Sequence, residues 1–155
     1  MLKRGEAMTE LLFYHLQRAP LERVLPGLLE KSLQRGWRCA VQGPQERLRS
    51  LDDVLWTYND EAFLPHGLES DDGPAQPIVL VTHEGNPNGA AIRFLVDGAP
   101  LPADAPSYER IVLMFDGNDA DAVQGARDQW KQAKELGFAA TYWQQSDEGR
   151  WEKKA

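Results

Sequence analysis

Cysteine, histidine and positive charge are all scarce in this sequence of 155 residues. Cys39 is the single cysteine, so the chain can form neither an internal disulfide nor a zinc site of four cysteines, and we expect a reducing, cytoplasmic location. Histidines are only three and scattered, so we expect no metal site. Lysine and arginine number 17 against 24 acidic residues, a net charge of −7. This acidity argues against direct binding to nucleic acid, which needs a basic face.

Long apolar runs and the motifs of nucleotide-dependent enzymes are also missing. No run approaches the ~18 apolar residues of a membrane span. Residues 1–7 are expected to be a loosely ordered N-terminal extension rather than a signal peptide. The glycine-rich phosphate-binding motifs are absent, and no serine stands in a nucleophile elbow. Cys39 falls in an expected strand and is interpreted as a buried apolar side chain, so we expect neither a cofactor nor catalytic residues.

Residues 8–155 alternate between strand-like and helix-like patterns. Apolar runs predict strands at 11–15, 37–41, 78–82, 91–96, 110–115 and 138–143. Amphipathic spacing predicts helices at about 20–36, 45–56 and 120–136, the first containing the awkward Pro26. This alternation predicts a single three-layer α/β/α domain, Rossmann-like without phosphate-binding loops, whose sheet is mostly parallel. The strand near 90–96 is the expected antiparallel member. Residues 60–77 form a long irregular connection, which favours a functional role.

Large apolar side chains cluster around the end of the second expected helix. The helical run Leu51-Asp52-Asp53-Val54-Leu55-Trp56 is followed by Phe63-Leu64-Pro65-His66. Two interpretations stay open. Pattern alone favours a hydrophobic plug beneath a long loop. The alternative is a protein-binding patch, because aromatic side chains are common anchors of interfaces.

A basic and aromatic stripe marks the third expected helix. Arg127, Trp130, Lys131 and Lys134 follow the spacing i, i+3, i+4 and i+7, which places them on one face. In an acidic protein such a stripe suits an acidic peptide with an aromatic or apolar end. The alternative is a solvated face, on which Lys131 pairs with Asp128 or Glu135 and Trp130 merely packs on the sheet.

Together the two clusters resemble the chi subunit of bacterial DNA polymerase III holoenzyme. The matching residues are Phe13-Tyr14, Leu51-Asp52-x-x-Leu55-Trp56, Phe63-x-Pro65-His66 and Ala126-Arg127-x-x-Trp130-Lys131-x-x-Lys134 with Gly137-Phe138. Their order and spacing cover residues 8–143. The resemblance implies an accessory, non-catalytic protein of the clamp-loader complex in DNA replication.

The resemblance also implies a role for the helical stripe. The family grips the acidic C-terminal tail of single-stranded DNA-binding protein, and the pocket for this tail corresponds to Arg127, Trp130, Lys131 and Lys134. Some family members carry lysine one turn before the arginine, where this chain has Val123. We therefore expect one cation fewer in the pocket and weaker tail binding.

A second family surface binds the psi subunit, where the bacterium has one, or a helicase of the XPD/Rad3-like type. The resemblance places this surface at Trp56, Phe63, Leu64, Pro65 and His66. A competing hypothesis remains: a nucleotide- or small-ligand-binding domain, or an enzyme, with its site at the carboxyl ends of the strands. The missing phosphate loops weigh against it.

Overall fold

The computed structural model describes residues 9–58, 64–68 and 73–155. The expected extension at 1–7 and the candidate residue Phe63 lie outside these residues. The elements in chain order are β1 (Glu10–Leu16), α1 (Leu21–Gln34), β2 (Cys39–Gln42), α2 (Gln45–Trp56), β3 (Gly67–Leu68), η1 (Gly73–Ala75), β4 (Ile78–Val81), β5 (Ile92–Val96), η2 (Ala105–Ser107), β6 (Arg110–Asp116), α3 (Ala120–Glu135), β7 (Ala139–Gln145) and β8 (Trp151–Lys153). Helix α1 runs through Pro26, which is buried within it.

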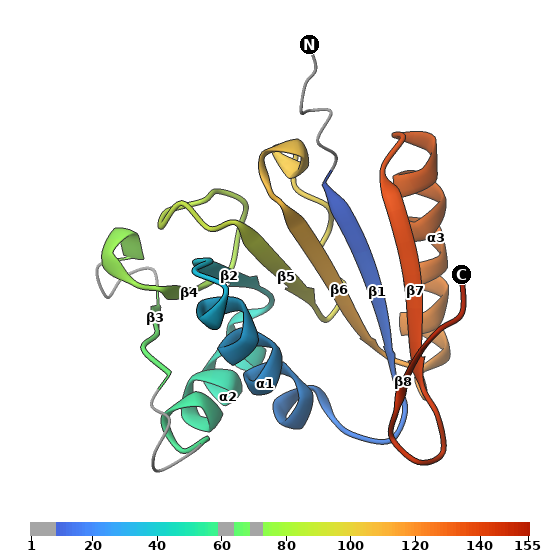
Figure 1. Ribbon diagram of the computed structural model, residues 1–155, viewed down its shortest axis with the longest axis horizontal. Coiled ribbons are helices and arrows are strands. Elements are labelled where there is room, and N and C mark those ends of the chain that lie inside the picture. Colours follow the sequence, from blue (N-terminus) through green and yellow to red (C-terminus); the bar gives the residue numbers. More distant parts are fainter. Residues whose placement is uncertain (1–8, 59–63, 69–72) are drawn as a thin grey trace.

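The described strands form one sheet in the order β3-β4-β2-β5-β6-β1-β7-β8 (Figure 1). Neighbouring strands are parallel except for β7 and β8. The expectation of an antiparallel strand near 90–96 is wrong, because β5 pairs in parallel with both β2 and β6. A short loop, residues 146–150, joins β7 to β8 as a hairpin, the connection that antiparallel strands allow and parallel strands do not.

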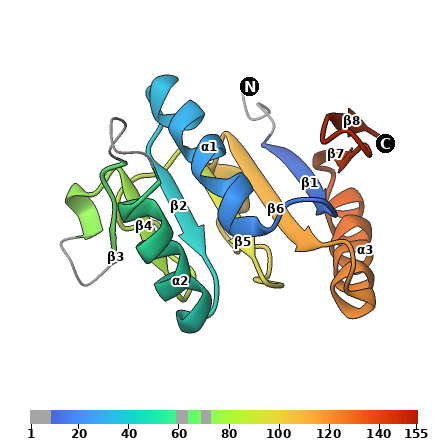
Figure 2. The same ribbon diagram turned by 90° about the horizontal axis from the view of Figure 1, so that it is seen from below.

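The helices lie on both faces of the sheet, which confirms the three-layer α/β architecture. Figure 2 shows α1 and α2 over one face and α3 over the other. The crossover through α1 carries the chain from β1 to β2, whereas the crossover through α3 carries it from β6 to β7, in the opposite direction across the sheet. Because such crossovers have one preferred hand, opposite directions place the helices on opposite faces.

Each face of the sheet has its own core. On the side of α1 and α2, Leu25 and Leu55 pack with Val112 and other strand residues. On the α3 side, Ala126 and Ala133 pack with buried strand side chains. Their small size lets α3 approach the sheet closely.

Cys39 is buried in β2, as its position in an apolar run predicts. Burial raises the pKa of its thiol to about 12. The interpretation of Cys39 as a buried side chain is therefore confirmed.

Arg93 on β5 is the largest fully buried side chain of the described residues. Its guanidinium donates hydrogen bonds to Gln42 Oε1, Tyr108 Oη and the carbonyls of His83 and Gly85, at 2.7 to 3.1 Å. These bonds satisfy the buried charge and hold two loops on the α3 side of the sheet. The described part of the chain contains no helix able to span a membrane and no cluster of side chains able to hold a metal ion.

Candidate functional site

Helix α3 is positioned by defined signals at both ends. At its start, Asp119 Oδ1 accepts hydrogen bonds from the backbone N–H groups of Asp121 and Ala122. At its end, Gly137 adopts a φ of 87°, a left-handed conformation that suits glycine. Between these ends the four residues of the predicted stripe lie on one face of the helix, as their spacing requires.

The stripe combines exposed cations with a half-buried indole. Arg127, Lys131 and Lys134 are exposed, and no ion pair within the described part of the chain involves them. The predicted pairs of Lys131 with Asp128 or Glu135 are thus not formed. Three cations remain available to an acidic partner.

Trp130 is fixed on the sheet by aromatic contacts. Its ring lies 5.3 Å from that of Phe13 and 6.1 Å from that of Tyr142, measured between centroids. The Lys134 ammonium lies 5.0 Å from the indole centroid, a cation–π contact. The expectation that Trp130 packs on the sheet is therefore confirmed, and the same ring also borders the cations of the stripe.

The two edges of α3 carry opposite charge. Asp121 and Asp128 line a cavity of about 640 Å³ between α3 and the loop that follows β5. On the other edge, Arg127 lies close enough to the end of β1 to influence His15 electrostatically. The edge of α3 that carries Arg127 therefore lies beside β1 and β7.

His15 and Tyr142 extend this edge, and sequence reasoning missed both. His15 Nδ1 lies 2.7 Å from Tyr142 Oη. Burial and the charge of Arg127 lower the pKa of His15, against an opposing effect of Asp116. Burial raises the pKa of the Tyr142 hydroxyl, although Arg127 opposes this effect. The two residues are 127 positions apart, so no local pattern in the sequence could have joined them.

In the second predicted cluster, Trp56 at the end of α2 packs against His66. Trp56 is 54% exposed, and its indole lies 4.7 Å from the His66 ring. His66 is buried, with Nδ1 2.7 Å from the Leu64 carbonyl and Nε2 3.0 Å from Asp52 Oδ1. Asp52 therefore holds the histidine on which Trp56 rests.

The two interpretations of this cluster each hold for different residues. Leu64 is 3% exposed and belongs to the core beneath α1 and α2, so it is a plug. Trp56 is a surface side chain. Pro65 is half-buried beside them. Among the described residues of the predicted surface, Trp56 is therefore the large side chain that a partner can reach.

The two candidate sites lie far apart on the fold. Helix α2 packs over β4 on one face, and α3 packs over β6, β1 and β7 on the other (Figure 2). From β4 to β1, the middle strand of these three, there are four steps along the sheet order, roughly 19 Å at ~4.8 Å per step. The two candidate sites therefore do not overlap.

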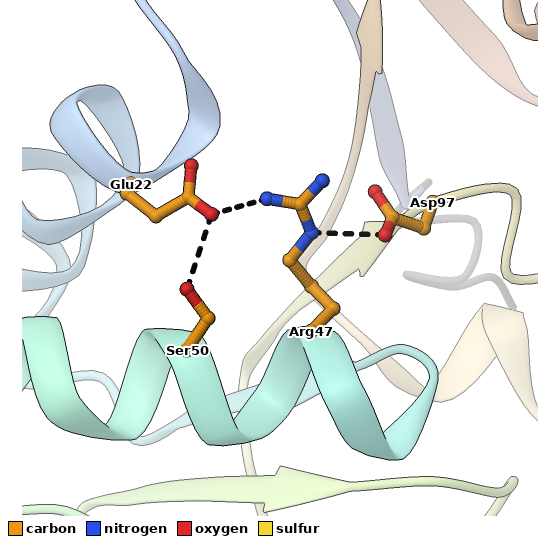
Figure 3. Close-up of polar contacts among 4 residues, drawn as sticks. All are labelled: Glu22, Arg47, Ser50 and Asp97. Atoms are coloured by element: carbon orange, nitrogen blue, oxygen red, sulfur yellow. Dashed lines mark hydrogen bonds and ion pairs between the residues drawn. The ribbon is translucent and has the colours of Figure 1, made fainter.

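The carboxyl ends of the strands are the place where the competing hypothesis puts a ligand. A cavity of about 340 Å³ opens there beside the ends of β1 and β6. Figure 3 shows Arg47, from α2, between Glu22 and Asp97, two acidic residues that line this cavity. The Arg47 guanidinium pairs with Glu22 and, at 2.9 Å, with Asp97. Ser50 also donates to Glu22, at 3.3 Å. Because Arg47 is already paired with two carboxylates, its guanidinium is not free to bind the phosphates of a nucleotide in this crevice.

Comparisons with known proteins agree with the resemblance in the motifs. The family model described as DNA polymerase III chi subunit, HolC, matches residues 8–141. The DNA polymerase III subunit chi of Pseudomonas aeruginosa is 31% identical over 114 residues, 72% of this chain and 77% of that protein. A probable DNA polymerase III subunit chi of Rickettsia prowazekii is 28% identical over 91 residues, 57% of this chain and 55% of that protein. The chain therefore belongs to the family of DNA polymerase III chi subunits.

Proposed function

We propose that this chi-family protein is a non-catalytic accessory subunit of the clamp-loader complex, acting in the bacterial cytoplasm. Its task is to link that complex to the acidic C-terminal tail of single-stranded DNA-binding protein. The observation that carries this proposal is the α3 stripe: three exposed cations outside any ion pair of the described residues, beside a half-buried indole, in a chain of net charge −7.

The chemistry of the stripe matches that of such a tail. Arg127 can take a carboxylate through two parallel N–H groups, while Lys131 and Lys134 act as point charges. The apolar residue at the end of the tail would lie against Trp130, whose ring is held in place by Phe13 and Tyr142. The acidic edge of α3 would repel the tail and so fix the side on which it binds.

The test is a titration of a fluorescent tail peptide from the host's own single-stranded DNA-binding protein. Arg127→Ala should weaken binding roughly 10- to 100-fold, because a hydrogen bond to a charged group is worth about 1.5–3 kcal/mol. Arg49→Ala, which removes an exposed arginine from α2, is the matched control and should bind normally. Added salt should weaken the wild-type complex, because exposed ion pairs are screened. Equal affinity of the two variants would refute the assignment.

We further propose that Trp56 anchors the other partner, either the psi subunit or an XPD/Rad3-like helicase. An exposed tryptophan at a helix end is the type of residue that dominates binding energy at interfaces. Its support by the buried His66 keeps the indole in one orientation before the partner arrives. The corresponding mutations are argued in the Discussion.

A nucleotide-binding role is separated from this proposal by thermal shift. A ligand that binds only the folded chain raises the melting temperature. Under the proposed function the tail peptide should raise it and nucleotides should not. A clear shift with a nucleotide would instead favour a site in the acidic crevice around Arg47.

A further inference from the structure

A third cavity, on the face of the sheet opposite α3, has a different composition from the two already described. It encloses about 240 Å³ between the end of α1 and the strands β5, β6 and β1. Its apolar lining consists of Leu12, Tyr14, Leu28, Ile92, Phe94 and Val112. Its polar lining consists of Ser32 and three cationic residues, Lys31, Arg35 and Arg110. Among the described residues no carboxylate lines it, whereas acidic side chains line both of the cavities described above.

Two of its cations have no carboxylate partner among the described residues. Lys31 and Arg35 are exposed, stand four residues apart at the end of α1, and enter no ion pair in the described part of the chain. Arg110 is already paired with Glu10, whose Oε1 accepts bonds of 3.1 and 2.9 Å from its guanidinium. Even with Glu10 counted, the rim of this cavity is positive in a protein that is negative as a whole.

The surrounding aromatic rings are already engaged by neighbouring side chains. The Arg35 and Arg110 guanidinium carbons lie 4.0 and 5.4 Å from the centroid of the Trp37 ring. Tyr14 lies against Trp151, with centroids 4.7 Å apart. Binding of single-stranded nucleic acid relies on ring faces that are free to stack on bases. The rings here are used in holding the cations and the strand β8, which favours a peptide over a nucleic acid.

The size of the cavity indicates what enters it. Pockets for drug-sized molecules begin at roughly 300 Å³, and this cavity is smaller. Its floor of aliphatic and aromatic side chains suits one large apolar side chain. Carboxylates on the same ligand would then meet Lys31 and Arg35 at the rim.

We propose that this cavity is a second peptide-binding site, which takes an acidic protein segment through one large apolar side chain. It is separate from the α3 stripe, since α1 and α3 cover opposite faces of the sheet (Figure 2). The proposal therefore does not depend on tail binding at α3. With both sites, one chain could hold two acidic segments at once.

The experiment uses the full chain and a fluorescent peptide of four aspartates followed by leucine and phenylalanine. To isolate the cavity, Arg127, Lys131 and Lys134 are first changed to glutamine. In this background Lys31→Gln/Arg35→Gln should weaken peptide binding at least about tenfold. The matched control, Arg23→Gln/Arg49→Gln, removes the same charge from exposed positions on α1 and α2 and should bind normally.

Three results would overturn the proposal. One is equal affinity of the cavity variant and its control. A second is equal binding of a peptide of aspartates alone, which would reduce the effect to bulk charge. A third is displacement of the peptide by a short oligothymidylate, which would point to nucleic acid. If the cavity variant does not fold, the readout is the NMR resonance of the Trp37 indole N–H in the chain that carries only the three glutamine substitutions on α3. This resonance must shift when the peptide is added.

The same measurements keep the two sites distinct. Loss of binding only in the Arg127 variants, with none in the Lys31 and Arg35 variant, leaves the proposed function standing and removes the second site. Loss of binding only in the Lys31 and Arg35 variant leaves the second site standing and removes the proposed function. In the wild-type chain, titration calorimetry should count two peptides per chain if both proposals hold.

Discussion

Trp130 lies edge-on to Phe13, with ring centroids 5.3 Å apart and ring planes inclined by 70°. Phe13 is fully buried in the central part of the sheet, so the indole is anchored to the core on one side. On its other side it contacts the Lys134 ammonium. One side chain therefore serves both the packing of α3 and the basic stripe.

Replacement of Trp130 should separate these two contributions. We expect Trp130→Ala to lower the free energy of unfolding by about 2–3 kcal/mol, below the full cost for a buried aromatic because the ring is half-buried. It should also weaken tail binding. Trp130→Phe should recover most of the stability and part of the affinity, since it keeps the contact with Phe13. Urea denaturation and peptide titration measure both, and an unchanged stability of Trp130→Ala would contradict the packing role.

The orientation of Trp56 at the end of α2 should depend on Asp52, which acts through His66. Asp52→Ala removes the carboxylate 3.0 Å from His66 Nε2, which loosens the ring on which Trp56 rests. We expect this variant to fold, to bind the tail peptide normally, and to recover less psi subunit or helicase in a pull-down. Trp56→Ala should lose the same partner more completely, with little change in melting temperature because the indole is 54% exposed.

Asp53→Ala is the matched control for Asp52→Ala. Asp53 is the exposed neighbour on the same helix, and its loss should leave partner capture unchanged. If the Asp52 and Asp53 variants capture the partner equally, the orientation of Trp56 by His66 is not needed for binding. A large drop in the melting temperature of Trp56→Ala would mean that the indole is a core residue.

The parts of the fold that sequence reasoning predicted are those with strong local patterns. Leu21, Leu25 and Leu29 recur every fourth residue along α1, and all are buried against the sheet. Strands β3 and β8 were not predicted, because they are two and three residues long and exist through pairing with β4 and β7. Pairing partners also decide strand direction, so the antiparallel neighbour could not be located from the pattern of one strand.

The candidate sites divide in the same way. The α3 stripe is a relationship within one helix, so spacing alone places Arg127 and Trp130 on one face. The link from Asp52 to His66 spans 14 residues and a loop, and only the folded chain brings the two together. Likewise, apolar character does not distinguish Leu64, a core plug, from Trp56, a surface residue.

His15 should make the stability of the fold depend on pH in a definite direction. Its Nε2 is buried and has no hydrogen-bond partner among the described residues, and burial and Arg127 lower its pKa from 6.5. The unfolded chain therefore binds a proton more readily, so stability falls as the pH drops below about 6.5. His15→Gln should lose this part of the dependence. Urea denaturation at about pH 7.5 and pH 5.5 measures it, and since His66 and His83 are common to both proteins, identical slopes would exclude His15 as the cause.

The two candidate surfaces should bind independently, because a linking protein must hold both partners at once. Helices α2 and α3 lie on opposite faces of the sheet, and the described residues of the two sites share no contacts. Distant sites without shared contacts are additive within about 0.5 kcal/mol, or roughly twofold in affinity. We therefore expect saturating tail peptide to leave the affinity of the partner at Trp56 unchanged within that range. The measurement is a titration of this partner with and without excess peptide. Arg127→Ala, which should bind the peptide roughly 10- to 100-fold more weakly and so be less occupied at the same peptide concentration, serves as the control. A tenfold loss of affinity in the wild type alone would mean that the two sites are coupled, and a bridge between two partners would then no longer explain the arrangement.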